Sequence, residues 1–314
     1  MKKMALVLFI VGVGLINAQV EVPNAPQWKI TLHVINEDGT PVTNATAFVD
    51  YYVPAPPPER QGGYKWTGLT DCSGCFTVAI HAGQHIGYGA EKPVYYSTDG
   101  LEYRFQSEVD RKWQPWNPTN DIVLKRIIKP IPMYAKRIDA QPPADGNPVG
   151  YDLMVGDWVA PYGKGINPDI LFTREYNRKS LQDYDYKLTV SFPKAGDGIQ
   201  EFLVPYKNME GSALRSPHEA PTNGYQPQIV RLNISHPGQK LIFDYDENRV
   251  YFFRVRTVLD ENGNVKSALY GKTYGDFMQF AYYVNPTPNS RNVEFDPKQN
   301  MMKNLKPLEG VDAP

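Results

Sequence analysis

The sequence predicts an all-β protein made of two β-sandwich domains that are joined by a proline-rich linker. Hydrophobic residues alternate with polar ones over many short stretches, which is the period-2 pattern of half-buried strands. Twenty-eight prolines and 25 glycines supply many turns, and 21 tyrosines favour strands over helices. The 314 residues are enough for two domains, each with a core of its own.

The first 18 residues have the form of a secretory signal peptide. Lys2 and Lys3 precede the apolar stretch from Met4 to Ile16, and Ala18 offers a small residue at the expected cleavage point. As a helix this stretch would rise about 20 Å, which is too short for a bilayer core of roughly 30 Å. We therefore expect a secreted, extracellular or periplasmic protein with no integral membrane segment after signal removal. An uncleaved anchor is the alternative.

The charge of the chain argues against nucleic-acid partners. Without Lys2 and Lys3, 31 of the 33 basic residues remain against 34 acidic ones, which gives a net charge near −3. Binding to nucleic acid depends on neutralising phosphates with clustered basic residues. Here the basic residues are scattered, apart from a short cluster between Lys125 and Lys129. We expect neither a nucleic-acid nor a membrane-surface role.

The first predicted domain covers residues 27–127. Its opening strand is marked by Trp28, Ile30, Leu32 and Val34, which alternate with polar residues. An Asp-Gly turn at 38–39 precedes a predicted return strand over residues 45–53. The proline-rich stretch 54–63 must be a loop, because it cannot hold a strand ladder. Further strands are expected over residues 65–70, 76–80, 103–106 and 122–126.

Two stretches of this domain resemble a known family. Residues 39–49, GTPVTNATAFV, are similar to the opening of carboxypeptidase regulatory-like (transthyretin- or prealbumin-like) domains, and residues 70–76, TDCSGCF, resemble the family's T-D-x-x-G-x-F turn. Gly74 would supply the positive φ of that turn. The resemblance implies a non-catalytic accessory module of secreted proteins. The loop 54–63 and the stretch around Trp113 depart from a minimal version of the family and could carry a particular binding role.

Residues 128–150 are predicted to be an extended, semi-rigid linker or a docking segment, because five prolines crowd this stretch. The second domain is expected over residues 151–286 and a polar C-terminal tail over residues 287–314. A short helix is expected around residues 174–183. Further strands are expected over residues 186–192, 202–206, 229–235, 240–244, 251–259, 267–274 and 277–284, the clearest alternation being that of Tyr251, Phe253 and Val255.

One hairpin of the second domain resembles a second family. Residues 251–258, YFFRVRTV, followed by residues 260–264, DENGN, look like the last hairpin of a fibronectin type III-like sandwich. The resemblance implies that Tyr251 acts as a tyrosine corner. The segment 151–165, YDLMVGDWVAPYGKG, has the look of a family signature, but the sequence attaches no activity to it.

Cys72 and Cys75 are the two cysteines of the chain, and they flank a two-residue turn. The ends of a β-turn lie within about 7 Å of each other, and export favours oxidation, so we predict a disulfide between them. A redox centre is one alternative, although strands rather than a helix flank the motif. A zinc site with His81 and His85 is another, with a spacing shorter than in zinc fingers. Two free thiols remain the third.

The sequence indicates no catalytic residue, no metal site and no cofactor. Acidic residues alternate over residues 244–248 as in a calcium loop, but the glycine and the distal glutamate of such a loop are missing, so a solvated turn is the interpretation. The motifs G-x-S-x-G and H-E-x-x-H are absent. A pair of carboxylates for glycoside hydrolysis stays open, since their partners are set by the fold.

Aromatic residues near loops and strand ends are the candidates for ligand binding. Rings held on a rigid sandwich can stack on sugars or peptides. We select Trp113 and Trp116, with Tyr95 and Tyr96; Tyr51, Tyr52, Trp66, Trp158 and Tyr162 belong to the same wider group. The hypothesis is a non-catalytic binding or structural protein whose partner is a polysaccharide or a cell-surface protein. A hydrolase with carboxylates in the second domain and a subunit of a surface assembly are the alternatives.

Overall fold

The computed structural model describes residues 25–53, 62–138, 141–202, 211–244, 249–277 and 279–314. Over these residues the chain forms strands and turns and no helix, so the predicted all-β class is confirmed. The described residues therefore also hold no helix that is long and apolar enough to cross a membrane. The predicted signal peptide and most of the loop 54–63 lie outside the described residues.

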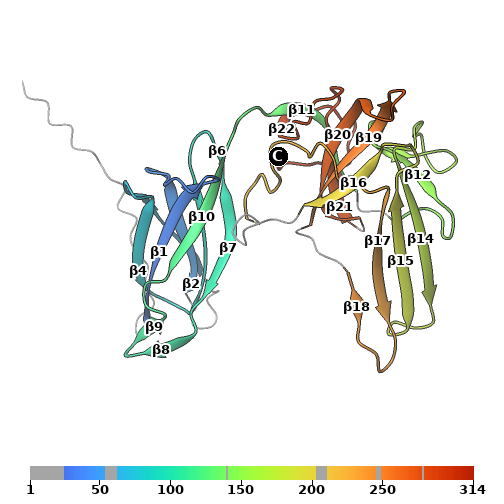
Figure 1. The fold of residues 1–314 in the computed structure, drawn as a ribbon. Coiled ribbons are helices and arrows are strands. Elements are labelled where there is room, and N and C mark those ends of the chain that lie inside the picture. The colour runs from blue at the N-terminus through green and yellow to red at the C-terminus, as the bar shows by residue number, and fades with distance from the viewer. Residues whose placement is uncertain (1–24, 54–61, 139–140, 203–210, 245–248, 278) are drawn as a thin grey trace, which may run out of the picture. The chain divides into compact units, whose positions relative to one another are not determined.

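The chain divides into two compact units (Figure 1). Unit 1 consists of residues 1–92 and 100–122, and unit 2 consists of residues 93–99 and 123–314. Strand β7 (Thr98–Arg104) and strand β10 (Thr119–Arg126) therefore each have residues in both units. The predicted domain limits of 27–127 and 151–286 stay predictions.

Two sheets organise the first part of the chain. One has the order β6–β10–β1–β9–β8, with β4 also paired to β1, and the other has the order β3–β2–β5–β7. Trp28, Ile30, Leu32 and Val34 of β1 are all fully buried, as their alternation predicts. The strands other than β7 and β10 are β1 (Gln27–Asn36), β2 (Thr46–Val53), β3 (Gly62–Leu69), β4 (Cys75–His81), β5 (His85–Glu91), β6 (Tyr95–Tyr96), β8 (Ser107–Val109) and β9 (Lys112–Gln114).

Strands β1 and β2 do not form the hairpin that the Asp-Gly turn predicts. β1 pairs antiparallel with β4, where Trp28 lies opposite Ile80, whereas β2 pairs with β3 and β5 in the other sheet. Trp28 packs edge-on against Tyr51 of β2, with ring centroids 6.2 Å apart. Alternation indicates which side chains are buried but not which strand is the hydrogen-bonded partner. It therefore cannot distinguish a hairpin from a crossing between sheets.

The turn before β4 confirms the predicted conformation of Gly74, whose φ is +75°. A Cβ at this position would lie 2.6 Å from the carbonyl oxygen of Val34, so a side chain is excluded by space as well as by backbone angle. Asp71 closes the turn by accepting hydrogen bonds from the backbone N–H groups of Ser73 and Cys75, each over 2.9 Å.

Unit 2 contains two six-stranded sheets, with the orders β16–β19–β20–β21–β11–β22 and β13–β12–β14–β15–β17–β18. Their strands are β11 (Ile131–Ile138), β12 (Val149–Asp152), β13 (Asp157–Trp158), β14 (Ile170–Arg178), β15 (Tyr184–Ser191), β16 (Gly198–Phe202), β17 (Gln228–Ser235), β18 (Ile242–Phe243), β19 (Val250–Leu259), β20 (Val265–Asp276), β21 (Gln279–Val284) and β22 (Phe295–Asn300).

The main core of unit 2 joins both sheets. Tyr251, Phe253 and Val255 of β19 lie in one cluster with Leu188 and Val190 of β15, so the predicted faces of these strands are confirmed. Val250 and Phe252 of β19 are also buried, in two other clusters. Burial on both faces of the strand explains why residues 250–253 are all apolar.

The segments predicted as a linker and a tail contribute strands to unit 2. β11 pairs antiparallel with β21 and parallel with β22, and Met133 and Ala135 of β11 are fully buried. From the tail, Phe295 and Val311 are buried in the same cluster. Proline content alone led to the linker prediction, but Met133 and Ala135 are spaced by two, as in a strand. Part of the predicted linker 128–150 thus consists of strand residues of unit 2, and the linker is not confirmed.

The short helix predicted around residues 174–183 is wrong. Those residues form the end of β14 and the turn into β15, and the two strands stay in register from Leu171 opposite Ser191 to Arg178 opposite Tyr184. The rings of Tyr176 and Tyr186 meet edge-on across this pair, with centroids 5.9 Å apart. Residues 175–178 are exposed, so they carry no apolar pattern that could have identified the strand.

Candidate functional site

Unit 2 contains a groove of about 680 Å³ that lies beside the ring of Trp158. We call it the Trp158 groove. Its walls come from β11, from the β12–β13 hairpin and from the C-terminal segment 301–314. It is lined by Lys136, Arg137, Ile138, Tyr151, Gly156, Asp157, Trp158, Lys306, Pro307, Leu308 and Glu309.

Trp158 is held by aromatic contacts on two sides. It lies opposite Tyr151 in the β12–β13 pairing, and the two rings meet at right angles with centroids 5.0 Å apart. Phe172 of β14 meets the same ring at 5.5 Å. Because Tyr151 and Phe172 are buried while Trp158 stays half-exposed, the ring is fixed from behind and open toward the groove.

The chain after Trp158 folds back tightly on the β12–β13 hairpin. A Cβ on Gly163 would lie 2.5 Å from the carbonyl oxygen of Trp158, and one on Gly165 would lie 2.6 Å from that of Asp157. The Asp157 carboxylate accepts hydrogen bonds from the backbone N–H groups of Trp158 and Lys164. The segment 151–165 thus needs its glycines and aspartates to build the loop that supports the ring.

A buried ion cluster supports the other end of this loop. Arg256 of β19 donates to Asp152 over 3.0 Å and to both oxygens of Asp169 over 2.8 and 2.9 Å. Asp152 also accepts four backbone N–H groups of the segment 154–167. Arg256 lies at a bulge of β19 with φ +55°, a conformation that aims its side chain at the two carboxylates.

The two carboxylates of this cluster differ in pKa. Burial raises the pKa of Asp169 in spite of the hydrogen bonds from Arg256. Burial alone would also raise the pKa of Asp152, but its backbone hydrogen bonds and Arg256 together lower it. Neither residue lines the Trp158 groove, and each is occupied by donors of the protein itself. This pair of carboxylates therefore holds the loop to β19 through Arg256.

The polar wall of the groove is tied to the C-terminal segment. The Lys136 ammonium lies 3.1 Å from the Glu309 carboxylate and donates to the Gly156 carbonyl over 2.8 Å. The backbone N–H of Arg137 donates to the carbonyl of Glu309. Burial alone would raise the pKa of Glu309, but hydrogen bonds from the Lys306 backbone and from Lys136 hold it below its ordinary value. Glu309 is therefore ionised at neutral pH.

The aromatic residues selected from the sequence are divided between the two units. In unit 1, Trp113 donates its indole N–H to the Ala82 carbonyl over 2.9 Å and is half-buried, while Trp116 is 37% exposed with the Lys112 ammonium 5.1 Å from its ring centroid. In unit 2, Tyr96 is 8% exposed. The four residues do not line the Trp158 groove, and their role in binding stays a prediction.

Tyr95 and Tyr96 form strand β6, which pairs with Arg126 and Lys125 of β10. The Tyr96 hydroxyl donates to Glu294 over 2.8 Å, and the Arg126 guanidinium lies 5.8 Å from the Tyr95 ring centroid. The Tyr96 ring is thus buried, whereas Tyr95 keeps a half-exposed ring.

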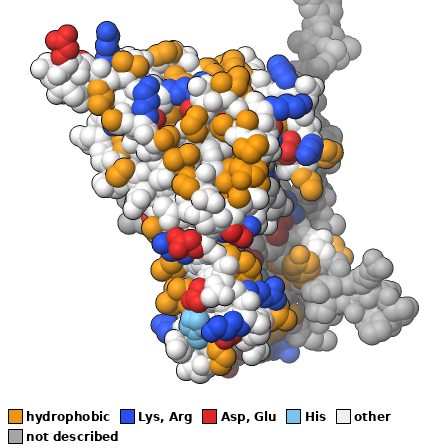
Figure 2. Space-filling model, turned by 90° about the vertical axis from the view of Figure 1, so that its right-hand side faces the viewer, with side chains coloured by type: hydrophobic (Ala, Val, Ile, Leu, Met, Phe, Trp, Pro, Cys, Tyr) orange, Lys and Arg blue, Asp and Glu red, His pale blue; other side chains and the backbone are white. Residues whose placement is uncertain are grey.

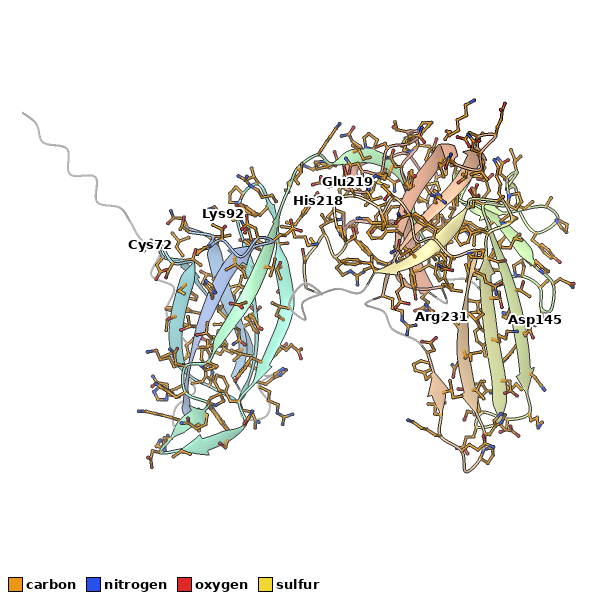
Figure 3. All side chains as sticks on the ribbon, in the orientation of Figure 1. Cys72, Lys92, Asp145, His218, Glu219 and Arg231 are labelled. Atoms are coloured by element: carbon orange, nitrogen blue, oxygen red, sulfur yellow. The ribbon has the colours of Figure 1, made fainter. Side chains whose placement is uncertain are left out.

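Cys72 and Cys75 are both free thiols in the structure, so the disulfide between them stays a prediction. Cys72 is exposed in the turn before β4 (Figure 3). Of the residues of the zinc alternative, His81 contacts the Ala25 carbonyl at 3.0 Å and His85 lies 3.3 Å from Glu102. Within the described ranges, no three acidic, histidine or cysteine side chains gather as metal ligands would.

The acidic turns have ordinary structural roles. Asp260 accepts hydrogen bonds from the backbone N–H groups of Asn262 and Asn264, and Gly263 has a φ of +80°, as the predicted Asn-Gly hairpin requires. Most of the calcium-like stretch 244–248 lies outside the described residues. Tyr251, the expected tyrosine corner, bonds through its hydroxyl to Arg231 of β17.

Sequence reasoning placed Trp158 in the wider aromatic group but did not single it out. The segment 151–165 could have identified Trp158, because its pattern of glycines and aspartates is more specific than that of an ordinary turn. The opposite wall could not be anticipated, because Lys136 and Glu309 come from segments that were predicted to be a linker and a tail.

No protein-family model and no curated protein matches this chain. Among solved structures, a 3-chlorocatechol 1,2-dioxygenase from Rhodococcus opacus 1CP is similar at 13% identity and a TM-score of 0.26, over 35% of this chain and 64% of its own length. The shaft pilin SpaA from Lactobacillus rhamnosus GG is similar at 12% identity and a TM-score of 0.25, over 55% and 90%.

A third solved structure, a candidate carbohydrate-binding protein from Bacteroides uniformis ATCC 8492, is similar at 11% identity and a TM-score of 0.19, over 85% of this chain and 100% of its own length. The chain spans less than two thirds of the dioxygenase. At these TM-scores the likenesses carry no argument about the activity or the partners of this chain.

Proposed function

We propose that this chain is an exported, non-catalytic binding protein that recognises a polysaccharide through the Trp158 groove. The observation that carries the proposal is the half-exposed ring of Trp158, held rigidly at the wall of a groove of about 680 Å³ that also presents charged side chains. Export rests on the predicted signal peptide, residues 1–18.

The composition of the groove suits a sugar. The face of a pyranose ring is largely apolar and stacks on an aromatic ring, while its hydroxyls need hydrogen-bond donors and acceptors around the edge. Trp158 supplies the ring, and Lys136, Lys306 and Glu309 supply polar groups on the opposite wall. Because contacts within the protein hold Trp158 and Lys136 in place, little conformational entropy is lost on binding.

The two carboxylates that line the groove are poorly suited to glycoside hydrolysis. A general acid needs a raised pKa so that it is protonated at working pH. The pKa of Glu309 is instead lowered and its carboxylate is paired with Lys136. Both oxygens of Asp157 accept backbone hydrogen bonds. These contacts favour recognition over catalysis in this groove.

The resemblance of residues 28–126 to carboxypeptidase regulatory-like domains fits the same role. In that family the domain is an accessory module of secreted proteins, and the TDCSGCF turn adopts the conformation that its glycine requires. We therefore assign unit 1 a supporting role and place recognition in unit 2.

The test is a glycan and polysaccharide array with the mature protein from Gln19 onward. Trp158→Ala should abolish binding, and the double variant Trp113→Ala/Trp116→Ala is the matched control that removes two tryptophans of unit 1. Trp158 also packs on Tyr151, so its replacement can affect folding. Lys306→Ala, at an exposed position of the groove, provides a second measurement that leaves the fold intact.

If the double variant lost glycan binding while Trp158→Ala still bound, the binding site would lie in unit 1. If the protein bound none of the glycans, the proposal of carbohydrate recognition would be wrong. A role as a subunit of a surface assembly would then be favoured. For that alternative the structure offers exposed Leu241, Ile242 and Phe243 around the edge strand β18. On the face in Figure 2, hydrophobic side chains lie in separate groups with polar surface between them.

A further inference from the structure

Two walls of the Trp158 groove come from segments that lie far apart in the chain. One wall is the β12–β13 hairpin, which carries Gly156 and Trp158, and the other is the C-terminal segment with Glu309. Lys136 of β11 lines the same groove and contacts both walls. The distance between the walls therefore depends on what Lys136 holds.

One ammonium group joins the two walls. Nζ of Lys136 donates to the Gly156 carbonyl over 2.8 Å and lies 3.1 Å from Oε1 of Glu309. The second carboxylate oxygen, Oε2, accepts the backbone N–H of Lys306 over 3.0 Å. The side chains of Lys136 and Glu309 are 15% and 23% exposed, so water screens this pair less than it screens a surface pair.

The hairpin wall is fixed against Lys136 by packing. Gly156 has a φ of +73°, and a Cβ at this position would lie 3.3 Å from Cδ of Lys136 and 3.0 Å from Cε of Met302. The backbone of Gly156 is thus enclosed between these two side chains. The hydrogen bond from Lys136 adds to a contact that packing already maintains.

The C-terminal wall is attached differently. Residues 306–309 form a turn, in which the Glu309 N–H donates to the Lys306 carbonyl over 2.9 Å. Leu305 before the turn packs on the main core and Val311 after it is buried, whereas residues 306–308 are exposed. The turn joins β11 through the Lys136–Glu309 pair and through the hydrogen bond from the Arg137 N–H to the Glu309 carbonyl.

We propose that Lys136 is the positioning residue of the Trp158 groove: it holds the turn 306–309 at a fixed distance from the Trp158 hairpin, and protonation of Glu309 releases the turn. The inference rests on the proposed function and adds the regulation of the same site. With the pair intact, a sugar ring that stacks on Trp158 also meets the polar groups of the turn. Once the turn is released, these groups are no longer held in place and binding weakens.

The sign of the pH dependence follows from Glu309. Its pKa is held below the ordinary value of 4.5, so the link to Lys136 is complete above that value and is lost as the pH falls through the lowered pKa. The charged and titratable groups that face Glu309 are Lys136 and Arg137 of β11, Tyr151 of β12, Asp157 of β13 and Lys306 of the turn itself. The cations stay charged and the tyrosine stays neutral in acid, so Asp157 is the competing carboxylate in this set.

Fluorine NMR of the full mature chain labelled with fluorotryptophan tests the position of the turn without a ligand. Trp158 belongs to unit 2, and its resonance is assigned with Trp158→Phe. This resonance should shift as the pH falls from about 7 to about 3, the range in which carboxylates titrate. In Glu309→Gln it should no longer titrate. The internal references are the tryptophans of unit 1, which are Trp28, Trp66, Trp113 and Trp116.

Substitutions of Lys136 separate positioning from folding. Lys136→Met should give the acid position of the Trp158 resonance already at neutral pH, whereas Lys136→Arg, which keeps the cation and its donors, should restore the titration. On the glycan array Lys136→Met should bind about tenfold more weakly, the scale of one charge-assisted hydrogen bond. Glu175→Gln is the matched control, because Lys187 donates to Glu175 over 2.8 Å in an exposed pair outside the groove.

A Trp158 shift that persists in Glu309→Gln would assign the pH response to Asp157 and overturn the inference. Unchanged glycan binding by Lys136→Met would also overturn it and would leave the proposed function standing. If the unchanged protein bound no glycan, the proposed function would be wrong, and the regulation inferred for it would be wrong as well.

Discussion

The hydroxyl of Tyr96 donates a 2.8 Å hydrogen bond to the carboxylate of Glu294, although 198 residues separate them in the sequence. Both side chains are buried. Glu294 also accepts the backbone N–H groups of Ile128 and Lys129 over 2.8 and 2.6 Å, and His218 lies 3.4 Å from it. One carboxylate thus connects β6 and the segment that follows β10 to the C-terminal part of unit 2.

Replacing Tyr96 by phenylalanine should destabilise unit 2. The ring still fills its space, but a buried carboxylate loses one donor, which costs about 2 kcal/mol. Urea unfolding followed by tryptophan fluorescence measures the change. Tyr52→Phe, which removes a hydroxyl from an exposed ring of unit 1, should leave the free energy of unfolding nearly unchanged. Equal stability of the two variants would show that the contact with Glu294 contributes little.

Two substitutions of Arg256 separate its charge from its backbone conformation. Arg256→Ala leaves Asp169 and Asp152 buried without their cation, and we expect a loss of about 3 kcal/mol. Arg256→Gly loses the same charge but relieves the positive φ of +55°, which is worth about 1 kcal/mol. Glycine should therefore be the less harmful substitution in denaturant unfolding. A more stable alanine variant would show that the backbone at this bulge relaxes when the guanidinium is removed.

The sequence predicted the strands better than their partners. The alternation of Trp28, Ile30 and Leu32 marks residues that are all fully buried, because one face of a sheet must exclude water whichever strand lies beside it. The partner of β1 is β4 rather than β2, a choice that depends on contacts between distant segments.

The candidate site was harder to predict than the fold. Trp158 belongs to a segment whose glycines signal a tight loop, but the groove exists because Lys136 of β11 and Glu309 of the C-terminal segment meet opposite it. Those two segments are rich in proline, and proline is compatible with an irregularity in strand pairing, as between Ile131 and Met133 of β11, as well as with a linker. Composition could not decide between the two, and pairing with β21 and β22 decided it.

His236 should titrate above its ordinary range. It bonds to Asp183 over 2.8 Å and to Asp185 over 3.1 Å, which joins the β14–β15 turn to the residue that follows β17. The bond to Asp183 is the main cause that raises the pKa of His236, and the pKa of Asp183 is lowered in return. The raised pKa means that the folded protein favours protonated His236. The contribution of this interaction to folding stability is therefore full below the pKa of the unfolded state, and it is lost as the pH rises through the pKa of the folded state.

NMR titration of the His236 ring measures this pKa directly. Asp183→Asn should lower it more than Asp185→Asn does, because Asp183 makes the shorter hydrogen bond. Equal shifts from the two variants would mean that the ring responds to the general negative charge of the turn and not to one partner.

A single methyl group at Gly163 should disturb the Trp158 groove. The added Cβ of Gly163→Ala would lie 2.5 Å from the Trp158 carbonyl oxygen and 2.6 Å from Oδ1 of Asp157, both closer than real Cβ contacts allow. The loop must shift, and because Asp157 also holds the Trp158 backbone N–H, the ring moves with it. We expect a changed tryptophan emission spectrum and weaker binding on the glycan array.

Gly83→Ala is the matched control for this substitution, since nothing lies within 4 Å of a Cβ at that position and the residue belongs to unit 1. It should leave emission and binding unchanged. If Gly163→Ala alters the emission but binds glycans as well as the unchanged protein does, the position of the Trp158 ring does not control recognition. That result would separate the architecture of the loop from the function proposed for it.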